Sequence, residues 1–444
     1  TKSNFNAQDG QLPGGVSQCS SAVRRSSRRY DGTMNSPLTD LTTRLIHHPY
    51  TAPGGFVSPV VPVHKASTVI FPDVAALRSR EWKDKTSYTY GMHGTPTTFI
   101  LEERLCELEG GLQCLLMPSG LAAIANVSLA LLRTGDEVLI PDNVYGPNKS
   151  MAESALAQWG ISHRLYNALD VADLEAKLSP TTRLVWLEAP GSVTMEFPDL
   201  PAQVQMCRAR GITTALDNTW GAGLAFAPFD LDGDCSGRLA VDVSVHALTK
   251  YPSGGGDVLM GSAVTRDPAL HLKLKLMHMH LGIGVGANDV EAVLRSLPSM
   301  GLRYRAHDRA ARTLARWLQE QSPVAQVLHP ALAGSPGHDQ WQALCGAADG
   351  GEGLAAGLFS VVFDACHPQV KVDDFCDALR LFAIGYSWGG PMSLVVPYDI
   401  AQMRMGAHLQ LRAGTVVRFS IGLEAVQDLQ MDLQQALEVA FGRA

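Results

Sequence analysis

Three short segments of the sequence carry residues whose types and spacing could do chemistry together. An apolar run ends in Thr249-Lys250 and is followed by three glycines, so that Lys250 is expected at the carboxyl end of a strand. A second apolar run delivers Asp217 in the same way. In the third segment, the small residues Ser119-Gly120 begin a helix directly after a strand-like run.

Each segment has a chemical interpretation and an ordinary structural one. A partly desolvated lysine has a lowered pKa and can attack an aldehyde to form a Schiff base. A strand-end carboxylate can pair with a pyridinium nitrogen, which makes the ring an electron sink. The free N–H groups of a helix N-terminus attract phosphate, and the hydroxyl of Thr249 is a further donor. Taken singly, these residues could equally be a solvated lysine, a turn aspartate and a helix cap.

The elements that must position these residues alternate between helix and strand from about residue 120. Apolar residues at helical spacing predict helices at 120–132, 147–159, 171–178 and 199–210. Short apolar runs between turn residues predict strands at 137–141, 161–165, 183–188, 212–217 and 241–245. This alternation predicts an α/β fold whose mainly parallel sheet is covered on both faces and binds ligands beyond the carboxyl ends of its strands.

Composition shifts predict four parts of the chain. Residues 1–35 are rich in Ser, Gly and Arg and are expected to be a disordered leader or tag. Residues 36–94 contain several prolines and are expected to form an arm that contacts a neighbouring subunit. Residues 95–295 would be the large domain. Residues 296–444 would be a smaller α+β domain, with amphipathic helices at 304–320 and 425–441 and a strand at 358–363.

The bulk numbers exclude several classes of function. The chain has 444 residues, 46% of them hydrophobic and 18% charged, and a net charge of −7. Its cations cluster only in the leader, so a nucleic-acid partner is not expected. No window approaches the roughly 18 apolar residues of a membrane helix. The eight cysteines form no metal-ligand spacing, which predicts no metal site and favours reduced thiols in a cytoplasmic protein.

Motifs along the chain, taken together, indicate a family. They are Tyr90-Gly91-Met92-His93-Gly94-Thr95-Pro96-Thr97, Glu107-Leu108-Glu109-Gly110-Gly111, Pro118-Ser119-Gly120, Leu187-Glu188-Ala189-Pro190-Gly191-Ser192, Asp217-Asn218-Thr219-Trp220, Thr249-Lys250-Tyr251, Tyr386-Ser387-Trp388-Gly389-Gly390 and Arg418-Phe419-Ser420-Ile421-Gly422-Leu423-Glu424. Over about residues 56–442 the chain resembles the Cys/Met-metabolism family of fold-type-I pyridoxal-phosphate enzymes. Two segments, 190–192 and 386–390, resemble the branch that eliminates at the β-carbon.

The resemblance implies a seven-stranded, mainly parallel sheet in the large domain and pyridoxal 5′-phosphate as cofactor. It implies that Lys250 forms the Schiff base and moves the α-proton, that Asp217 holds the pyridine nitrogen, and that Tyr145 stacks on the ring. These are the three expected catalytic residues. The other implied contacts are Gly120, Leu121, Thr249 and a neighbouring subunit's Tyr90 on the phosphate, and Arg418, Ser387, Trp388 and Tyr90 on the substrate.

The implied reaction is β-elimination of L-cystathionine to homocysteine, pyruvate and ammonia, in methionine biosynthesis. The implied assembly is a homotetramer, built as a dimer of dimers with each active site between two subunits. Alternatives are a carbon–sulfur lyase acting on cystine or other β-thio amino acids, an enzyme acting at the γ-carbon, and a regulatory protein that has kept the fold without catalysis.

The sequence departs from the family pattern at two places. Many relatives carry an arginine that binds the cofactor phosphate at the position of Met92. The neighbouring His93 is a candidate replacement, and the alternative is that helix N–H groups and hydroxyls bind the phosphate without it. The loop after Lys250 has three glycines, at 254–256, where relatives often carry a histidine.

Overall fold

The computed structural model describes residues 40–47, 58–83, 85–234, 236–346, 352–404 and 410–442. The leader predicted over residues 1–35 therefore lies outside the described residues. Within them, no helix is both long and apolar enough to cross a bilayer.

The larger of two sheets has seven strands in the described residues, in the order β1-β7-β6-β5-β4-β2-β3. The strands are β1 (Gln113–Met117), β2 (Glu137–Pro141), β3 (Ser162–Tyr166), β4 (Thr182–Glu188), β5 (Thr213–Asp217), β6 (Val243–Ala247) and β7 (Gly261–Thr265). All neighbours are parallel except β7, which runs antiparallel to both β1 and β6. The predicted α/β fold with a mainly parallel seven-stranded sheet is confirmed.

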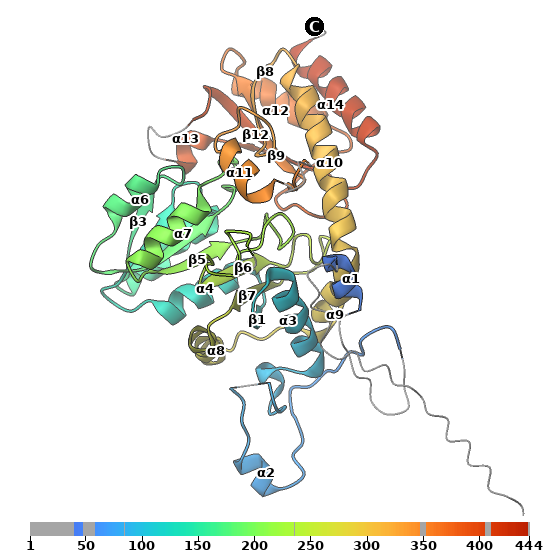
Figure 1. Cartoon of the computed structure of the whole chain (residues 1–444). Helices are drawn as coiled ribbons and strands as arrows, with labels where there is room; N and C mark the ends of the chain where they lie inside the picture. Colours follow the sequence, from blue (N-terminus) through green and yellow to red (C-terminus); the bar gives the residue numbers. More distant parts are fainter. Residues whose placement is uncertain are drawn as a thin grey trace, which may run out of the picture. The chain divides into compact units, whose positions relative to one another are not determined.

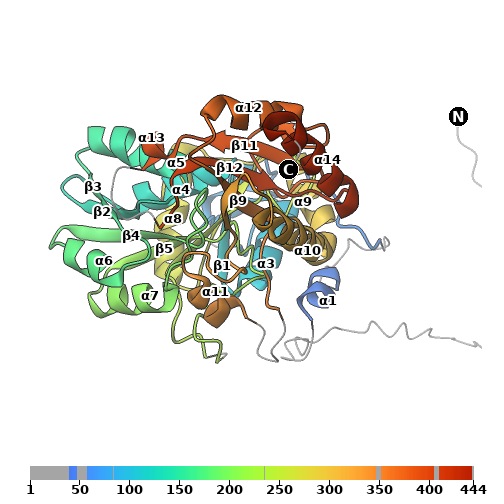
Figure 2. The same ribbon diagram turned by 90° about the horizontal axis from the view of Figure 1, so that it is seen from above.

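Helices cover both faces of this sheet, as Figures 1 and 2 show. They are α3 (Pro96–Glu109), α4 (Gly120–Leu131), α5 (Gly146–Met151), α6 (Val171–Lys177), α7 (Leu200–Ala209) and α8 (Pro268–Leu281). Successive residues of β4 pack into different clusters: Val185 and Leu187 with α3 and α7, Leu184 and Trp186 with α4. A strand whose alternate side chains are all buried requires apolar helices on both sides.

The second sheet has the order β10-β11-β12-β9-β8 in the described residues. Its strands are β8 (Val324–Leu328), β9 (Leu358–Asp364), β10 (Ala383–Ile384), β11 (Leu394–Tyr398) and β12 (Gly414–Ser420). The same part of the chain contains the helices α9 (Ala287–Ser296), α10 (Met300–Gln319), α11 (His338–Cys345), α12 (Gln369–Ala378), α13 (Ile400–Met403) and α14 (Val426–Phe441). Helices α10 and α12 pack against the second sheet, whereas α9 packs against α3, beside the large sheet. Of the residues predicted to form the apolar face of α14, Leu429, Leu433, Leu437 and Ala440 are buried and Val426 is half-buried.

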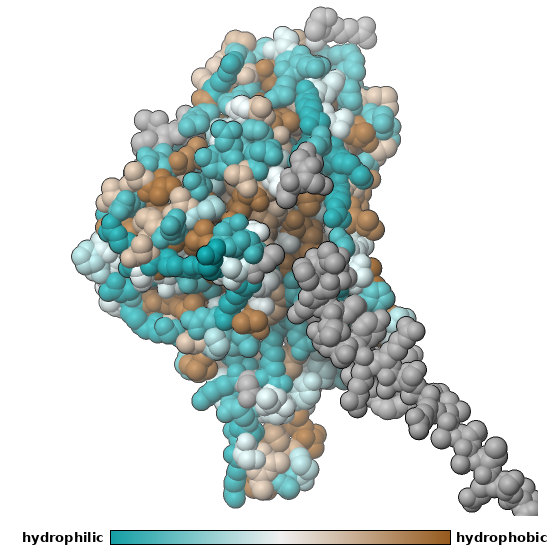
Figure 3. Space-filling view, in the orientation of Figure 1, coloured by the Kyte–Doolittle hydropathy of each residue, from teal (hydrophilic) through white to brown (hydrophobic). Residues whose placement is uncertain are grey.

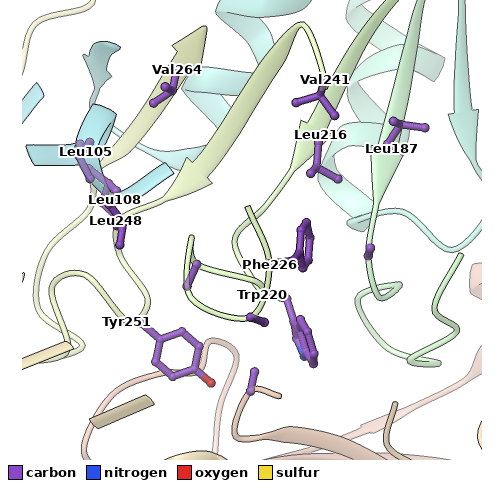
Figure 4. Packing of buried hydrophobic residues seen from close by; sticks show 14 of the residues in the cluster. Leu105, Leu108, Leu187, Leu216, Trp220, Phe226, Val241, Leu248, Tyr251 and Val264 are labelled. Atoms are coloured by element: carbon purple, nitrogen blue, oxygen red, sulfur yellow. The ribbon is translucent and has the colours of Figure 1, made fainter. Parts of the chain in front are cut away.

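Large aromatic side chains join the two sheets. Figure 4 shows Trp220 and Tyr251 beyond the strand ends of the large sheet, near Phe226 and Leu248. The Tyr251 hydroxyl accepts a hydrogen bond from the N–H of Gly357 at 2.8 Å, next to β9. These side chains fill one part of the space between the two sheets.

The structure differs from the predicted elements mainly outside the parallel strands. The helix expected over 147–159 is α5 followed by a π-helical turn, Ala152–Leu156. The region predicted as an arm contains α1 (Leu41–Ile46), α2 (Val74–Arg78) and the 3₁₀ turn Gly91–His93. In Figure 3 the lower end of the molecule, over α2 in Figure 1, carries hydrophobic residues on its surface.

Candidate active site

A cavity of about 400 Å³ lies at the carboxyl ends of three neighbouring strands, where they face the second sheet. The strand-end residues Glu188, Asp217 and Ala247 line one side, and Tyr398 and Arg418 of the second sheet line the other. Nine of the ten predicted site residues line this one cavity: Gly120, Leu121, Tyr145, Asp217, Thr249, Lys250, Ser387, Trp388 and Arg418.

Lys250 extends from the turn after β6 into this cavity. Its Nζ atom donates a hydrogen bond to Oγ of Ser387 at 2.9 Å and lies 5.6 Å from the centre of the Trp388 ring. Burial and the nearby positive charge of Arg418 lower the pKa of Lys250 to about 8, although the Asp217 carboxylate opposes the shift. A part of this amine is therefore neutral near neutral pH, as attack on an aldehyde requires.

Ser387 holds the lysine from a strained backbone position. Its φ of 106° lies in the region that side chains rarely adopt and glycine tolerates. Such residues cost roughly 1–3 kcal/mol and persist only where the surroundings impose them, often at functional sites. The sequence carries no signal for this strain, because a serine at this position does not by itself favour a positive φ.

Asp217 ends β5 and directs its carboxylate into the cavity. Its Oδ1 atom accepts hydrogen bonds from the N–H and the hydroxyl of Thr219, at 3.0 and 2.5 Å. Burial raises the pKa of Asp217, and these hydrogen bonds oppose the shift. Both donors bind Oδ1, and no described residue donates to Oδ2, so a cationic ring nitrogen could bind there.

The N-terminus of α4 forms another wall. A Cβ atom on Gly120 would lie 2.7 Å from the Cβ of Ala247, so only glycine allows this helix to approach β6 so closely. The Ser119 side chain accepts the N–H of Ala122, while the N–H groups of Gly120 and Leu121 are the first two of the helix. The first N–H groups of a helix have no partner within it and suit an anion.

Thr249 lies beside this wall but is bound to a neighbouring loop. Its hydroxyl donates to the carbonyl of Met260 at 3.3 Å and accepts from the Met260 N–H at 3.2 Å. Its contact with phosphate stays a prediction.

Arg418 is buried in the opposite wall, with 8% of its surface exposed. Its Nη1 atom donates to the carbonyl of Ser192 at 3.0 Å, and its guanidinium lies 5.3 Å from the Tyr398 ring centre. Burial lowers the pKa of Arg418, and no carboxylate of the described residues lies within ion-pair distance. A buried guanidinium without a carboxylate is a site for an anionic ligand.

Tyr145 and Glu188 connect the two walls. Tyr145 is 39% exposed, and burial, followed by the charges of Asp217 and Glu188, raises the pKa of its phenol. Glu188 accepts the Tyr145 N–H at 2.8 Å and the Ser192 hydroxyl at 2.6 Å. Burial and the neighbouring Asp217 raise the pKa of Glu188 to about 8. Neither Glu188 nor Tyr398 was predicted as a site residue, although Glu188 ends a predicted strand just as Asp217 does.

Tyr90 is the predicted site residue that lies outside this cavity. It is 44% exposed and lines a second cavity of about 770 Å³ together with Met92 and His93. Burial and the charges of Lys275 and Arg80 lower the pKa of His93, so in this chain it is a weak substitute for an arginine.

These residues fit pyridoxal 5′-phosphate. The amine of Lys250, the carboxylate of Asp217 and the N-terminus of α4 match its aldehyde, ring nitrogen and phosphate. The absence of a side chain at Gly120 lets this helix end lie directly against Ala247, at the edge of the cavity.

Comparisons with known proteins agree with this fit. A cystathionine beta-lyase of Bordetella avium is 37% identical over 395 residues, which are 88% of this chain and 95% of the relative. A cystathionine beta-lyase of Escherichia coli is 35% identical over 378 residues, 84% of this chain and 91% of the relative. The crystal structure of metB from Corynebacterium glutamicum matches with a TM-score of 0.79 and 25% identity, over 90% of this chain and 98% of that one. The model of the Cys/Met metabolism PLP-dependent enzymes matches residues 42–438, and the chain therefore belongs to this family, as its motifs predicted.

Proposed function

We propose that this chain catalyses the β-elimination of L-cystathionine to homocysteine, pyruvate and ammonia. The observation that carries the proposal is one cavity lined by a lysine of lowered pKa, a strand-end carboxylate and an arginine that pairs with no described carboxylate. The relatives named cystathionine beta-lyase, at 35 and 37% identity, support the choice of substrate.

In this proposal Arg418 binds the substrate α-carboxylate through parallel hydrogen bonds from its guanidinium. The Ser192 carbonyl and the Tyr398 ring hold that guanidinium in place. Ser387 and Trp388 lie beside Lys250 and close the same end of the cavity. Arg418 therefore fixes the α-carbon relative to the lysine amine.

When bound, pyridoxal 5′-phosphate supplies the aldehyde for Lys250 and a ring that accepts the electrons left by the α-proton. Asp217 holds the ring nitrogen, and the Tyr145 ring presses the cofactor into one plane. The N–H groups of Gly120 and Leu121 and the hydroxyl of Thr249 hold the phosphate. The Nζ atom of Lys250 takes the α-proton and delivers a proton to the leaving sulfur.

The proposal includes a homotetramer in the cytoplasm, with residues 36–94 as an arm that brings Tyr90 to the phosphate and substrate of a neighbouring subunit. Exposed apolar residues of this region support it: Ile70 is 85% exposed, and Val74 and Tyr88 are also exposed. Such side chains are typical of a surface that a partner covers. The large domain at 95–295 and the small domain at 296–444 are part of the same proposal.

The test is turnover of purified protein with L-cystathionine, with pyruvate and thiol quantified together. We expect equal amounts of pyruvate and homocysteine from the native chain and none from Lys250→Ala. Production of 2-oxobutyrate would refute elimination at the β-carbon. If cystine is turned over faster than L-cystathionine, the proposed reaction stands but cystine is the substrate. If the protein binds the cofactor and turns over neither compound, a regulatory protein is favoured.

A further inference from the structure

Two loops carry the groups that contact the cofactor and the substrate in the proposed function. The loop after β2 carries Tyr145, and the loop after β4 carries Ser192, whose carbonyl holds Arg418. The loops are in close contact. The Ser192 N–H donates to the Asn143 carbonyl at 3.2 Å, and a Cβ atom on Gly191 would lie 2.4 Å from the Asn143 side-chain nitrogen.

Glu188 lies between the two loops and binds both. Its Oε2 atom accepts the backbone N–H of Tyr145 at 2.8 Å, and its Oε1 atom accepts the hydroxyl of Ser192 at 2.6 Å. The backbone carbonyl of Ser192 in turn accepts a hydrogen bond from Nη1 of Arg418 at 3.0 Å. A continuous set of hydrogen bonds therefore runs from the tyrosine to the arginine through one carboxylate.

This carboxylate occupies an unfavourable place. Glu188 is 6% exposed, and it pairs in register with Asp217 on the neighbouring strand, so that two acidic groups share one cavity. Burial and the charge of Asp217 raise the pKa of Glu188 to about 8. A carboxyl group placed where its charge is costly is more typical of a functional site than of a packed core.

We propose that Glu188 is a positioning residue that sets the distance between the Tyr145 ring and the Arg418 guanidinium. It touches neither cofactor nor substrate in this role. It acts through its hydrogen bonds to the Tyr145 N–H and to the Ser192 hydroxyl. These bonds keep the loop that carries Tyr145 at a fixed distance from the loop that holds Arg418. The inference rests on the roles of Tyr145 and Arg418 in the proposed function.

The proposed role of Glu188 depends on its hydrogen bonds rather than on its charge. The substitutions Glu188→Gln and Glu188→Ala are therefore expected to have different effects. In Glu188→Gln the amide oxygen can still accept from the Tyr145 N–H, and the amide N–H can donate to the Ser192 hydroxyl, which also accepts. In Glu188→Ala both bonds are lost, and the Tyr145 N–H and the Ser192 hydroxyl lose their buried acceptor.

The matched control is Glu137→Gln. Glu137 is also 6% exposed, but it begins β2 at the opposite end of the sheet, where it accepts from Arg164, Ser179 and Thr182. Its substitution perturbs a buried carboxylate of the same sheet without touching either loop.

The experiment makes three measurements on holoenzyme: steady-state kinetics with L-cystathionine, which give kcat and KM, the visible circular dichroism of the bound cofactor, and the binding of propionate. Propionate carries a carboxylate but no amine, so it reports on Arg418 alone. For Glu188→Ala we expect the propionate dissociation constant and KM to rise about tenfold or more, since two hydrogen bonds are lost. The dichroism should fall because the ring of Tyr145 is no longer held. In Glu188→Gln the propionate dissociation constant, KM and the dichroism should return most of the way to the native values. In Glu137→Gln they should match those of the native chain.

If Glu188→Ala does not fold, Ser192→Ala still tests the inference. It removes one of the two bonds and keeps the carbonyl that holds Arg418, so we expect a smaller rise in the propionate dissociation constant, about threefold. No rise would overturn the inference.

Other outcomes separate this inference from the proposed function. If Glu188→Gln is as defective as Glu188→Ala, Glu188 acts through its charge and the positioning role is wrong. If Arg418→Lys weakens propionate binding while Glu188→Ala matches Glu137→Gln, only the inference fails. If Arg418→Lys binds propionate and turns over L-cystathionine like the native chain, the proposed function fails first.

Discussion

Replacing Ser387 separates the two things this residue does. It accepts a hydrogen bond from Lys250 at 2.9 Å, and it holds a φ of 106°. Ser387→Ala removes the hydrogen bond and keeps the strain. Ser387→Gly removes the hydrogen bond and relieves the strain as well. Comparing the two variants therefore gives each contribution separately.

The expected magnitudes follow from these two contacts. A hydrogen bond to a charged group contributes about 1.5–3 kcal/mol, so both variants should lose about 10- to 150-fold in kcat/KM. The strain of a side chain at this φ is about 1–3 kcal/mol, and the extra freedom of unfolded glycine offsets about 0.5–1 kcal/mol of that. Ser387→Gly should therefore be more stable than Ser387→Ala by about 1 kcal/mol.

Urea unfolding at one protein concentration with saturating cofactor measures the stability difference, and steady-state kinetics measure the activity loss. Ser253→Ala is the control, because Ser253 donates to the Thr249 carbonyl and does not line the cavity. Activity of Ser387→Ala within twofold of the native value would show that the Lys250 contact is not used in the reaction. A glycine variant less stable than the alanine variant would refute the strain.

Three further predictions follow from the same cavity. The pKa of Lys250 is about 8 in the folded chain rather than 10.5, so the unfolded chain binds more protons between pH 8 and pH 10.5. The contribution of Lys250 to the stability of cofactor-free protein should therefore rise with pH through that window. The rate of cofactor rebinding should rise towards pH 8, because more of the amine is then neutral. Arg418→Lys should raise KM for L-cystathionine about tenfold or more with a smaller change in kcat, because a lysine cannot make two parallel hydrogen bonds. Gly120→Ala should weaken cofactor binding measured by equilibrium dialysis, since its Cβ would meet that of Ala247 at 2.7 Å, and Ala247→Gly in the same chain should restore it.

Parts of the site that depend on local pattern could be predicted from the sequence. Apolar runs that stop at Asp217 and just before Lys250 place both residues at the carboxyl edge of a parallel sheet, whatever the exact order of the strands. The small residues at Ser119-Gly120 predict a helix N-terminus, because serine is a favoured N-cap residue. These predictions needed only the period of the pattern, the N-cap preference of serine and the rule that parallel strands end at one edge.

Other parts depend on contacts between distant segments. Arg418 reaches the cavity because β12 pairs with β11 and β9 in a second sheet, and its partner Tyr398 lies on β11. No local pattern predicts that Ser387 lies 2.9 Å from a lysine 137 residues earlier, or that its φ is positive. Glu188 has the same strand-end signal as Asp217, and only their pairing in register shows that two carboxyl groups share the cavity.

The charges in the cavity form one coupled set in the proposed function. The buried charge of Arg418 is the second cause, after burial, of the lowered pKa of Lys250. A substrate carboxylate bound at Arg418 neutralises that charge, so the pKa of the lysine amine rises when the substrate binds. Before binding, the lowered pKa keeps more of the amine neutral, as attack on an aldehyde requires; after binding, the neutral amine is a stronger base towards the α-proton. Arg418 thus couples substrate recognition to the basicity of Lys250.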